Sequence, residues 1–275
     1  MRLLSDLRTA LDREDLALHF QPKVDLRSGS VAGVEALLRW DHPRHGPIPP
    51  DEFIGLAEQT NLMPDLTRFV LRRALLAATG LDRAGFPLTM SVNLSSSDLM
   101  DAGFPARVDR LLGEHDLPPE RLVVEVTENS VMADRTRALG VLRELRDLGV
   151  RVSVDDYGTG HASLAYLREL PVDELKLDRS FLQGVPDDIH NAAIVRSTVE
   201  LAHALELSIV AEGVEDAACQ AWLRQLGCDV GQGFHISHPM PFEDLLAWLR
   251  TEPADPPAPA GLDDPARPSL VSPPT

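Results

Sequence analysis

The chain has 275 residues, with 26 basic and 43 acidic side chains, so its formal net charge is −17 at pH 7. This acidity excludes a nucleic-acid polymer and an anionic membrane as default partners, because both select basic surfaces. The sequence lacks a run of roughly 18 apolar residues, the length that a membrane helix needs, so we expect no membrane contact. It also lacks the apolar core of a signal peptide and any C-x-x-C motif, so we expect a cytoplasmic protein.

Short β-rich runs alternate with helical periodicity along the chain. The first two runs, residues 17–25 and 31–39, flank a turn signal at 27–30 and predict a hairpin. Apolar residues three or four positions apart, such as Leu62, Leu66 and Phe69, predict amphipathic helices between the later runs. Six further strands are predicted at residues 88–93, 122–127, 150–155, 174–177, 208–212 and 229–231.

The order of these elements predicts an α/β fold. Strands that alternate with helices form right-handed βαβ units and a parallel sheet. Eight strands in about 250 residues favour a modified TIM (β/α)8 barrel, in which the N-terminal hairpin is the irregular part. An open, doubly wound sheet is the alternative.

The last segment of the chain differs in composition from the rest. Residues 253–275 contain eight of the 22 prolines. Proline fixes φ and removes a backbone donor, so this composition predicts an extended, disordered segment. We therefore expect one folded domain at residues 1–251 and a disordered, proline-rich tail at residues 252–275.

Polar side chains interrupt or end most of the predicted strands. They lie in or directly after apolar runs, toward the carboxyl end of each strand except in the hairpin, and they are Glu35, Asn93, Glu125, Asp155, Asp156, Lys176, Glu212 and Gln232. In a barrel, this rim is where active sites are built. One buried Glu in a strand is more often part of an ion pair than a catalyst, but seven strands that place polar groups at one rim favour a functional site.

The charges of this set predict bound metal ions. Burying neighbouring carboxylates costs several kcal/mol per ion unless positive charge compensates, and Lys176 is the single lysine among them. Carboxylate and amide oxygens suit Mg²⁺, Mn²⁺ or Ca²⁺ better than zinc. The adjacent Asp155 and Asp156 can serve two ions at once, which predicts a two-metal phosphoryl-transfer site.

The same residues carry a family resemblance. The segment EALLRW at 35–40 resembles the signature of EAL domains, the bacterial phosphodiesterases that hydrolyse cyclic di-GMP. Other motifs follow in the family's order: QP at 21–22, PDEFI at 50–54, VNLS at 92–95, EVTE at 125–128, DDYGTG at 155–160, LKLD at 175–178, AEGVE at 211–215 and QGF at 232–234. The folded domain is identified as a member of this family, whose barrel has one antiparallel strand.

The resemblance implies two Mg²⁺ or Mn²⁺ ions per site. It assigns them to the metal-binding residues Glu35, Asn93, Glu125, Asp155, Asp156 and Glu212. Asp155 would bridge the two ions. We expect Ca²⁺ to inhibit, because its larger and looser coordination disrupts the two-ion geometry.

The resemblance also implies catalytic roles for Glu35, Lys176, Asp178, Glu212, Glu215, Gln232 and Glu128. Lys176 would position the attacking water and stabilise developing charge, with a plain ion pair as the alternative. Asp178 would be its companion acid, unless it only forms a salt bridge. Glu128 would anchor the loop after Asp156, or else be a solvent-facing residue at the start of a helix.

Substrate contacts are implied for four residues. Gln21 and Arg39 resemble positions that contact the guanine or phosphate of cyclic di-GMP, while Leu37 and Pro49 would line the pocket. The planar fork of Arg39 suits phosphate oxygens, although a salt bridge at the rim is the alternative. The family also suggests a homodimer formed through the loop after Asp156.

Three functions are consistent with the sequence. The first is metal-dependent hydrolysis of cyclic di-GMP to linear pGpG. The second is a catalytically silent cyclic di-GMP receptor or interaction module. The third is an unrelated barrel enzyme that acts on another phosphoester. Silent receptors of the family typically lose metal carboxylates, and all of them are present here, so hydrolysis is favoured.

Overall fold

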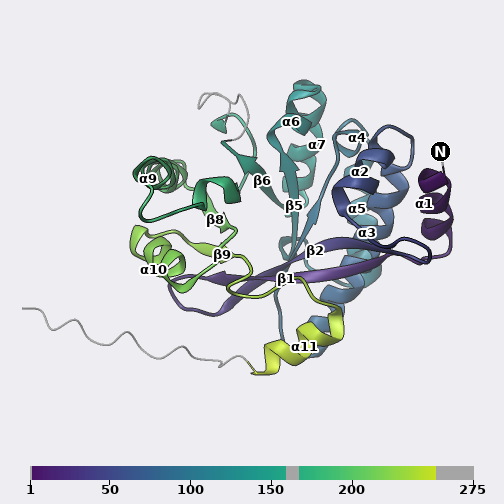
Figure 1. Cartoon of the computed structure of the whole chain (residues 1–275). Helices are drawn as coiled ribbons and strands as arrows, with labels where there is room; N and C mark the ends of the chain where they lie inside the picture. The colour runs from purple at the N-terminus through teal and green to yellow at the C-terminus, as the bar shows by residue number, and fades with distance from the viewer. Residues whose placement is uncertain (1, 159–166, 252–275) are drawn as a thin grey trace, which may run out of the picture.

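A closed ring of eight strands forms the centre of the molecule (Figure 1). The structure is a computed structural model, and it describes residues 2–158 and 167–251. The strands of the ring are β1 (Ala17–Asp25), β2 (Val31–His42), β4 (Thr89–Asn93), β5 (Leu122–Thr127), β6 (Arg151–Tyr157), β7 (Glu174–Leu177), β8 (Ser208–Glu212) and β9 (Val230–Gln232). All eight predicted strands are present. Some of their observed ends lie one to three residues away from the predicted ends.

The direction of the strands identifies the barrel type. β1 pairs antiparallel with both β2 and β9, whereas the ring strands from β2 to β9 pair in parallel. A ninth strand, β3 (Gly46–Ile48), pairs with β2 outside the ring. These pairings confirm the modified TIM barrel with one antiparallel strand from the N-terminal hairpin. The open-sheet alternative is wrong, because β1 closes the ring.

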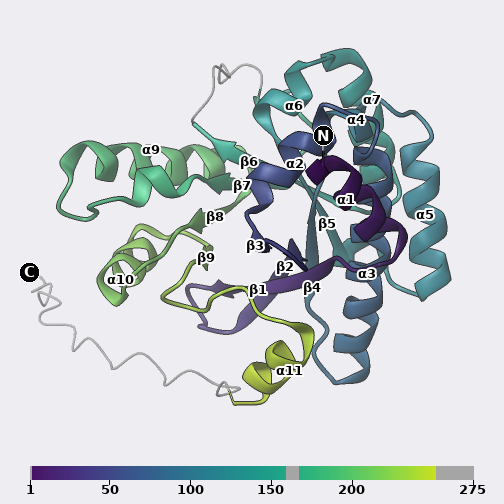
Figure 2. The ribbon, with the colours of Figure 1, turned by 45° about the vertical axis from the view of Figure 1, so that its right-hand side comes forward.

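Helices surround the ring (Figure 2). They are α1 (Arg2–Asp12), α2 (Pro50–Glu58), α3 (Met63–Arg83), α4 (Ser96–Leu99), α5 (Phe104–His115), α6 (Glu128–Met132), α7 (Arg135–Asp147), α9 (Ile189–Ala204), α10 (Ala217–Leu226) and α11 (Phe242–Thr251). Two 3₁₀ turns, η1 (Pro119–Arg121) and η2 (Arg179–Leu182), precede β5 and follow β7. The predicted tail lies outside the described residues, so its disorder stays a prediction.

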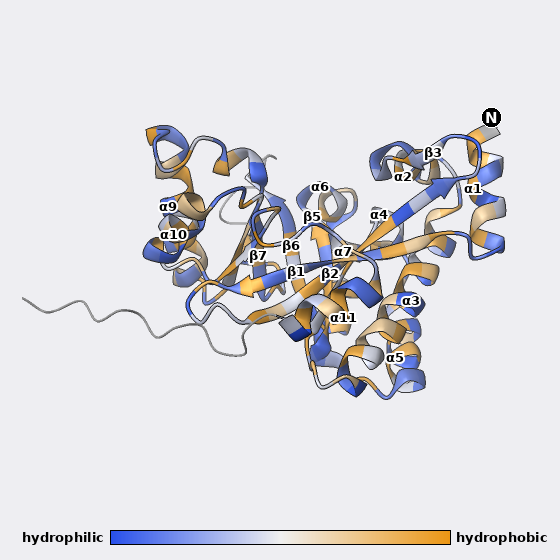
Figure 3. Ribbon diagram, turned by 60° about the horizontal axis from the view of Figure 1, so that its bottom comes forward, coloured by the Kyte–Doolittle hydropathy of each residue, from blue (hydrophilic) through white to orange (hydrophobic). Residues whose placement is uncertain are grey.

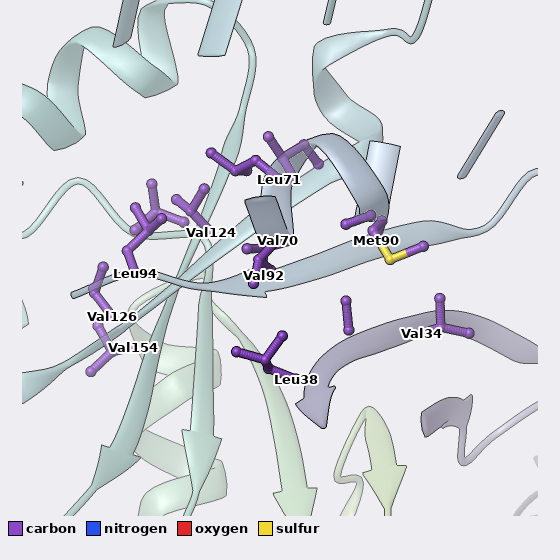
Figure 4. Packing of buried hydrophobic residues seen from close by; sticks show 14 of the residues in the cluster. Val34, Leu38, Val70, Leu71, Met90, Val92, Leu94, Val124, Val126 and Val154 are labelled. Atoms are coloured by element: carbon purple, nitrogen blue, oxygen red, sulfur yellow. The ribbon is translucent and has the colours of Figure 1, made fainter. Parts of the chain in front are cut away.

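The hydrophobic core lies between the ring and the helices. Figure 4 shows Val70 of α3 and Val92 of β4 in this layer, and both belong to one buried cluster that also includes Val124 of β5. Figure 3 shows that the surrounding helices carry both hydrophobic and hydrophilic residues. On α3, for example, the buried apolar residues Leu66, Val70 and Ala74 recur four positions apart, and this helix packs against β4.

The interior of the barrel is polar. Residues alternate between the two faces of a strand, so Glu125 faces the interior between two residues of the outer core, Val124 and Val126. Most TIM barrels fill this interior with branched apolar side chains. Here buried polar residues occupy it, among them Lys23, Ser91, Glu125, Ser153, Glu174 and Lys176. The interior therefore supports a charged site.

Candidate active site at the carboxyl end of the barrel

Lys176 lies at the centre of the carboxylate cluster. Its Nζ is 2.6 Å from Glu212 Oε1 and 2.7 Å from Glu125 Oε2. The same Nζ is 3.2 Å from Asp155 Oδ2 and 3.6 Å from Glu35 Oε2. The lysine side chain is 1% exposed. Burial disfavours the ammonium, but the surrounding carboxylates outweigh burial and raise the pKa of Lys176 well above its usual value.

Glu125 lies between two buried lysines. Its Oε2 accepts a hydrogen bond from Lys176, and its Oε1 accepts one from Lys23 Nζ at 3.3 Å. Burial alone would raise the pKa of Glu125. The two ammonium groups and the hydrogen bonds from Lys176 and Ser91 outweigh burial and lower this pKa to about 2. Glu125 is therefore the most strongly ionised carboxylate of the cluster.

Glu35 is held by two amide side chains. Asn93 Nδ2 donates to Glu35 Oε1 at 2.8 Å, and Gln232 Nε2 donates to Glu35 Oε2 at 2.7 Å. Gln232 Nε2 also lies 3.1 Å from Gln21 Oε1. Asn93 turns its nitrogen toward Glu35, and its amide oxygen accepts no hydrogen bond from a described residue, so this oxygen could act as a ligand. Strands β1, β2, β4 and β9 thus fix one side of the site.

A bulge at the end of β6 brings Asp155 and Asp156 to the same place. Neighbouring strand residues normally point to opposite faces. The pairing of β6 with β7 shifts register between Val154 and Tyr157, and Asp156 has a left-handed φ of 55°. Such bulges re-aim side chains. As a result, ligand oxygens of Asp155, Asp156 and Glu212 lie within 4.8 Å of one another.

The cluster has fewer positive than negative groups. Burial raises the pKa of Glu212 to about 8, and the nearby Asp155 and Glu35 add to this against the opposing effect of Lys176. Burial also raises the pKa of Glu35 and of Asp155, and Glu125 repels both of them. A cation added beside these carboxylates would oppose the rise of their pKa and favour the ionised forms.

The residues present fit divalent metal ions. The candidate ligands are carboxylate oxygens and one amide oxygen, which suit hard cations of the magnesium type. Six carboxylates surround the two lysines of the interior and its rim: Glu35, Glu125, Asp155, Asp156, Glu174 and Glu212. Fully ionised, this set has an excess of four negative charges, which two divalent ions would balance. The acidic group at the rim could therefore hold metal.

Two of the predicted substrate residues line one cavity beside the cluster. Arg39 and Leu37 line a cavity of about 240 Å³ together with Asn93. Arg39 Nη1 donates to the carbonyl of Leu38 at 2.8 Å, and Arg39 makes no salt bridge to a described residue, contrary to the alternative of a rim ion pair. The other predicted pocket residue, Pro49, lies on the surface at the start of α2. Its neighbour Pro50 lines the cavity instead.

The remaining predicted residues form no ion pair with Lys176 among the described residues. Asp178 begins η2, where its carboxylate accepts a hydrogen bond from Ser180 N at 3.0 Å, and it makes no salt bridge to a described residue. Glu215 is exposed beyond β8 and lines another cavity of about 360 Å³. Glu128 begins α6 and is buried, so it does not face solvent. The loop that it would anchor continues into residues 159–166, outside the described residues.

The sequence interpretation missed the lower layer of this network. Lys23, Ser91 and Glu174 are buried beneath the predicted site residues. The sequence does contain an indication that Lys23 belongs to the site. Lys23 lies two positions after Gln21 and therefore on the same strand face. It is also one of only two lysines in the chain.

Comparison with known proteins identifies the family. The family model of the EAL domain matches residues 4–239. The chain therefore belongs to the EAL domain family, and the resemblance found in the sequence is confirmed. Among the described residues, no helix has the length and apolar character needed to span a membrane.

Two relatives from Pseudomonas aeruginosa show how much sequence is shared. Over 248 residues the chain is 46% identical to the bifunctional diguanylate cyclase/cyclic di-GMP phosphodiesterase MucR, a match that covers 90% of the chain and 36% of MucR. Over 251 residues it is 41% identical to the cyclic di-GMP phosphodiesterase NbdA, covering 91% of the chain and 32% of NbdA. The chain spans about a third of the length of these relatives.

Solved structures share the fold. The c-di-GMP complex of the PaMucR phosphodiesterase has a TM-score of 0.84 at 46% identity, and the match covers 89% of this chain and 100% of that one. The FimX EAL domain of Pseudomonas aeruginosa bound to c-di-GMP has a TM-score of 0.79 at 27% identity, covering 86% and 96% of the two chains.

Proposed function

We propose that this chain is a metal-dependent phosphodiesterase that hydrolyses cyclic di-GMP to linear pGpG. The observation that carries the proposal is the set of carboxylates gathered around Lys176 at the carboxyl end of an EAL-family barrel. The printed names of MucR and NbdA, and the c-di-GMP complexes of two similar structures, support cyclic di-GMP as the substrate.

The proposed metal site holds two Mg²⁺ or Mn²⁺ ions. Glu35, Asn93 and Glu125 would bind one ion and Asp156 and Glu212 the other, with Asp155 bridging them. When bound, the ions would supply Lewis-acid polarisation of the scissile phosphate. The raised pKa values of Glu35, Asp155 and Glu212 support this assignment, because each of these groups gains from a nearby cation.

The side chains of the site would bind and orient the substrate. Arg39 would grip phosphate oxygens with its planar guanidinium, Gln21 would contact the dinucleotide from β1, and Leu37 and Pro49 would line its pocket. In hydrolysis, water loses a proton and its oxygen forms a new bond to phosphorus, the bond from phosphorus to the leaving ribose oxygen breaks, and that ribose oxygen gains a proton. Lys176, which stays protonated, would orient the water and stabilise negative charge on the phosphate.

Supporting roles are proposed for residues around this centre. Gln232 would hold Glu35 through the hydrogen bond described above. Asp178 and Glu215 would orient water from the loops after β7 and β8, and Glu128 would support the loop after Asp156. Homodimerisation through that loop, at residues 159–166, lies outside the described residues and stays a proposal, as does a cytoplasmic location.

The function can be tested with purified protein, cyclic di-GMP and either Mg²⁺ or Mn²⁺. We expect chromatography to show pGpG with each ion, and we expect Ca²⁺ to inhibit because its coordination is looser. Binding of cyclic di-GMP without formation of pGpG would favour the silent receptor. Absence of both binding and turnover would favour an enzyme for another phosphoester. Full activity with Ca²⁺ would contradict the two-ion geometry.

A further inference from the structure

We propose that Lys23 is a positioning residue that fixes the orientation of the Glu125 carboxylate, so that a single oxygen of Glu125 faces the metal site. This inference rests on the proposed function, in which Glu125 binds metal. Lys23 itself lies below the rim and would touch neither metal nor substrate. Its effect would be transmitted through Glu125.

Lys23 has three polar neighbours inside the barrel. Its Nζ donates to Ser91 Oγ at 2.6 Å and to Glu125 Oε1 at 3.3 Å. It lies 3.6 Å from Glu174 Oε1. The side chains of Lys23, Glu125 and Glu174 are 4%, 0% and 7% exposed. An ammonium so enclosed has few alternative positions, which makes it a rigid support for Glu125.

The strands around Lys23 are built to admit it. On β1, Gln21 and Lys23 share the inward face, with Gln21 nearer to the rim contacts of Gln232 and Lys23 one layer deeper. The cross-strand neighbour of Lys23 on β2 is Gly33. A Cβ at Gly33 would lie 2.1 Å from Thr89 Oγ1, so a side chain there has no room. The lysine therefore extends into the interior past a residue without a side chain.

The two oxygens of Glu125 are divided between two layers. Oε1 is held from below by Lys23, and Oε2 lies 2.7 Å from Lys176, the residue that also contacts Glu212 and Asp155. A carboxylate held in this way can offer one oxygen to an ion at the rim. Without Lys23, the buried Oε1 would lose its ammonium donor, and the carboxylate could rotate away from the ligand geometry.

Glu174 provides a matched control. It contacts Lys23 from β7, but it has no hydrogen bond to Glu125 among the described residues. Glu174→Gln therefore changes the charge of the same buried layer without removing the donor to Glu125. If Lys23 only balances buried charge, Lys23→Met should strengthen Mn²⁺ binding, because it leaves the interior more negative, and Glu174→Gln should not. If Lys23 positions Glu125, Lys23→Met should instead weaken Mn²⁺ binding, because the ligand loses its support.

The test measures Mn²⁺ affinity by calorimetric titration in the absence of cyclic di-GMP, together with the Tm of each metal-free variant. We expect Lys23→Met to weaken Mn²⁺ binding roughly 10- to 100-fold, as substitutions behind a metal ligand typically do. Glu174→Gln, which removes a carboxylate that contacts Lys23 and not the rim, should change Mn²⁺ affinity much less. Lys23→Met leaves Glu174 without its cation and Glu125 with Lys176 alone, and this could unfold the protein. Lys23→Met combined with Glu174→Gln removes one charge of each sign, so it should fold and still bind Mn²⁺ weakly.

Two outcomes would overturn the inference. One is equal Mn²⁺ affinity in the double variant and in Glu174→Gln, and the other is a loss of affinity in Glu174→Gln as large as in Lys23→Met. Failure of the proposed function gives a different result. A wild type that binds Mn²⁺ in a Lys23-dependent way but forms no pGpG would retain the positioning role and remove the assigned activity. A wild type that binds no Mn²⁺ would overturn both.

Discussion

Glu35 shows how much a single side chain contributes to the site. It accepts hydrogen bonds from Asn93 and Gln232 and lies 3.6 Å from the Lys176 ammonium. It is thus both a candidate metal ligand and the acceptor that orients two amides. Removing the Glu35 carboxylate would take a ligand oxygen from the proposed metal site. It would also lower the stability of the fold, because the amide groups of Asn93 and Gln232 would lose their acceptor.

We predict that Glu35→Ala abolishes formation of pGpG while the protein still folds. Leaving a buried donor unsatisfied costs about 1–3 kcal/mol, but removing a buried carboxylate whose pKa is raised offsets part of that cost. Chromatography of the products and urea unfolding measure the two effects. The exposed Glu120→Gln is the control and should leave both unchanged. Turnover at the wild-type rate in Glu35→Ala would contradict its assignment as a metal ligand.

At the scale of elements, hydrophobic patterning predicted the strands well and the local irregularities poorly. Near-continuous apolar runs identify strands covered on both faces, which is why β5 was predicted with its exact bounds. The helix α1 was not predicted, although Leu3, Leu7 and Ala10 follow helical spacing.

The site was predicted as a set of residues and not as a geometry. The positions of the polar residues at strand ends are visible in sequence, and the family motifs add their roles. The bulge at Asp156 is not visible, because it depends on how β6 pairs with β7. Lys23 was missed for a similar reason, since its partners Ser91 and Glu174 come from strands far apart in sequence.

The bulge in β6 leads to a prediction about Asp156. A left-handed backbone costs roughly 1–2 kcal/mol for an ordinary L-residue and nothing for glycine, with Asp and Asn better tolerated than most. We therefore expect Asp156→Val to be less stable than Asp156→Gly by about 1–2 kcal/mol, although both lose the same carboxylate. Urea unfolding of the metal-free variants measures this difference. Equal stabilities would show that the φ of 55° is not required by the fold.

For the whole molecule, the net charge of −17 acquires a more specific meaning. Part of the acidic excess lies inside the barrel, where Lys23 and Lys176 leave several carboxylates uncompensated. Metal ions that bind only the folded state stabilise it, by about 2.7 kcal/mol when their concentration is 100 times the Kd. In a protein of this size each kcal/mol raises Tm by roughly 2–4 °C. Metal binding should therefore be visible as thermal stabilisation.

The same excess makes the stability of the metal-free protein depend on pH. The pKa of Glu212 is raised from 4.5 to about 8 in the folded state, so folding favours the protonated carboxyl. The stabilisation is fully present below about pH 4.5 and is lost as pH rises toward 8. We expect the Tm of the metal-free wild type to fall over this range. Glu212→Gln should show a shallower decline, since the raised pKa values of Glu35 and Asp155 persist.

Saturating Mg²⁺ should remove much of that decline, because metal binding requires the ionised carboxylate and so becomes more favourable as pH rises. Melting curves with Mg²⁺ and with a chelator, recorded from pH 5 to pH 8, measure both effects. The control is again Glu120→Gln, whose curves should parallel those of the wild type. If metal-free wild type and Glu212→Gln had parallel Tm profiles, the protonated Glu212 would contribute nothing to stability. The uncompensated charge would then have to lie elsewhere in the cluster.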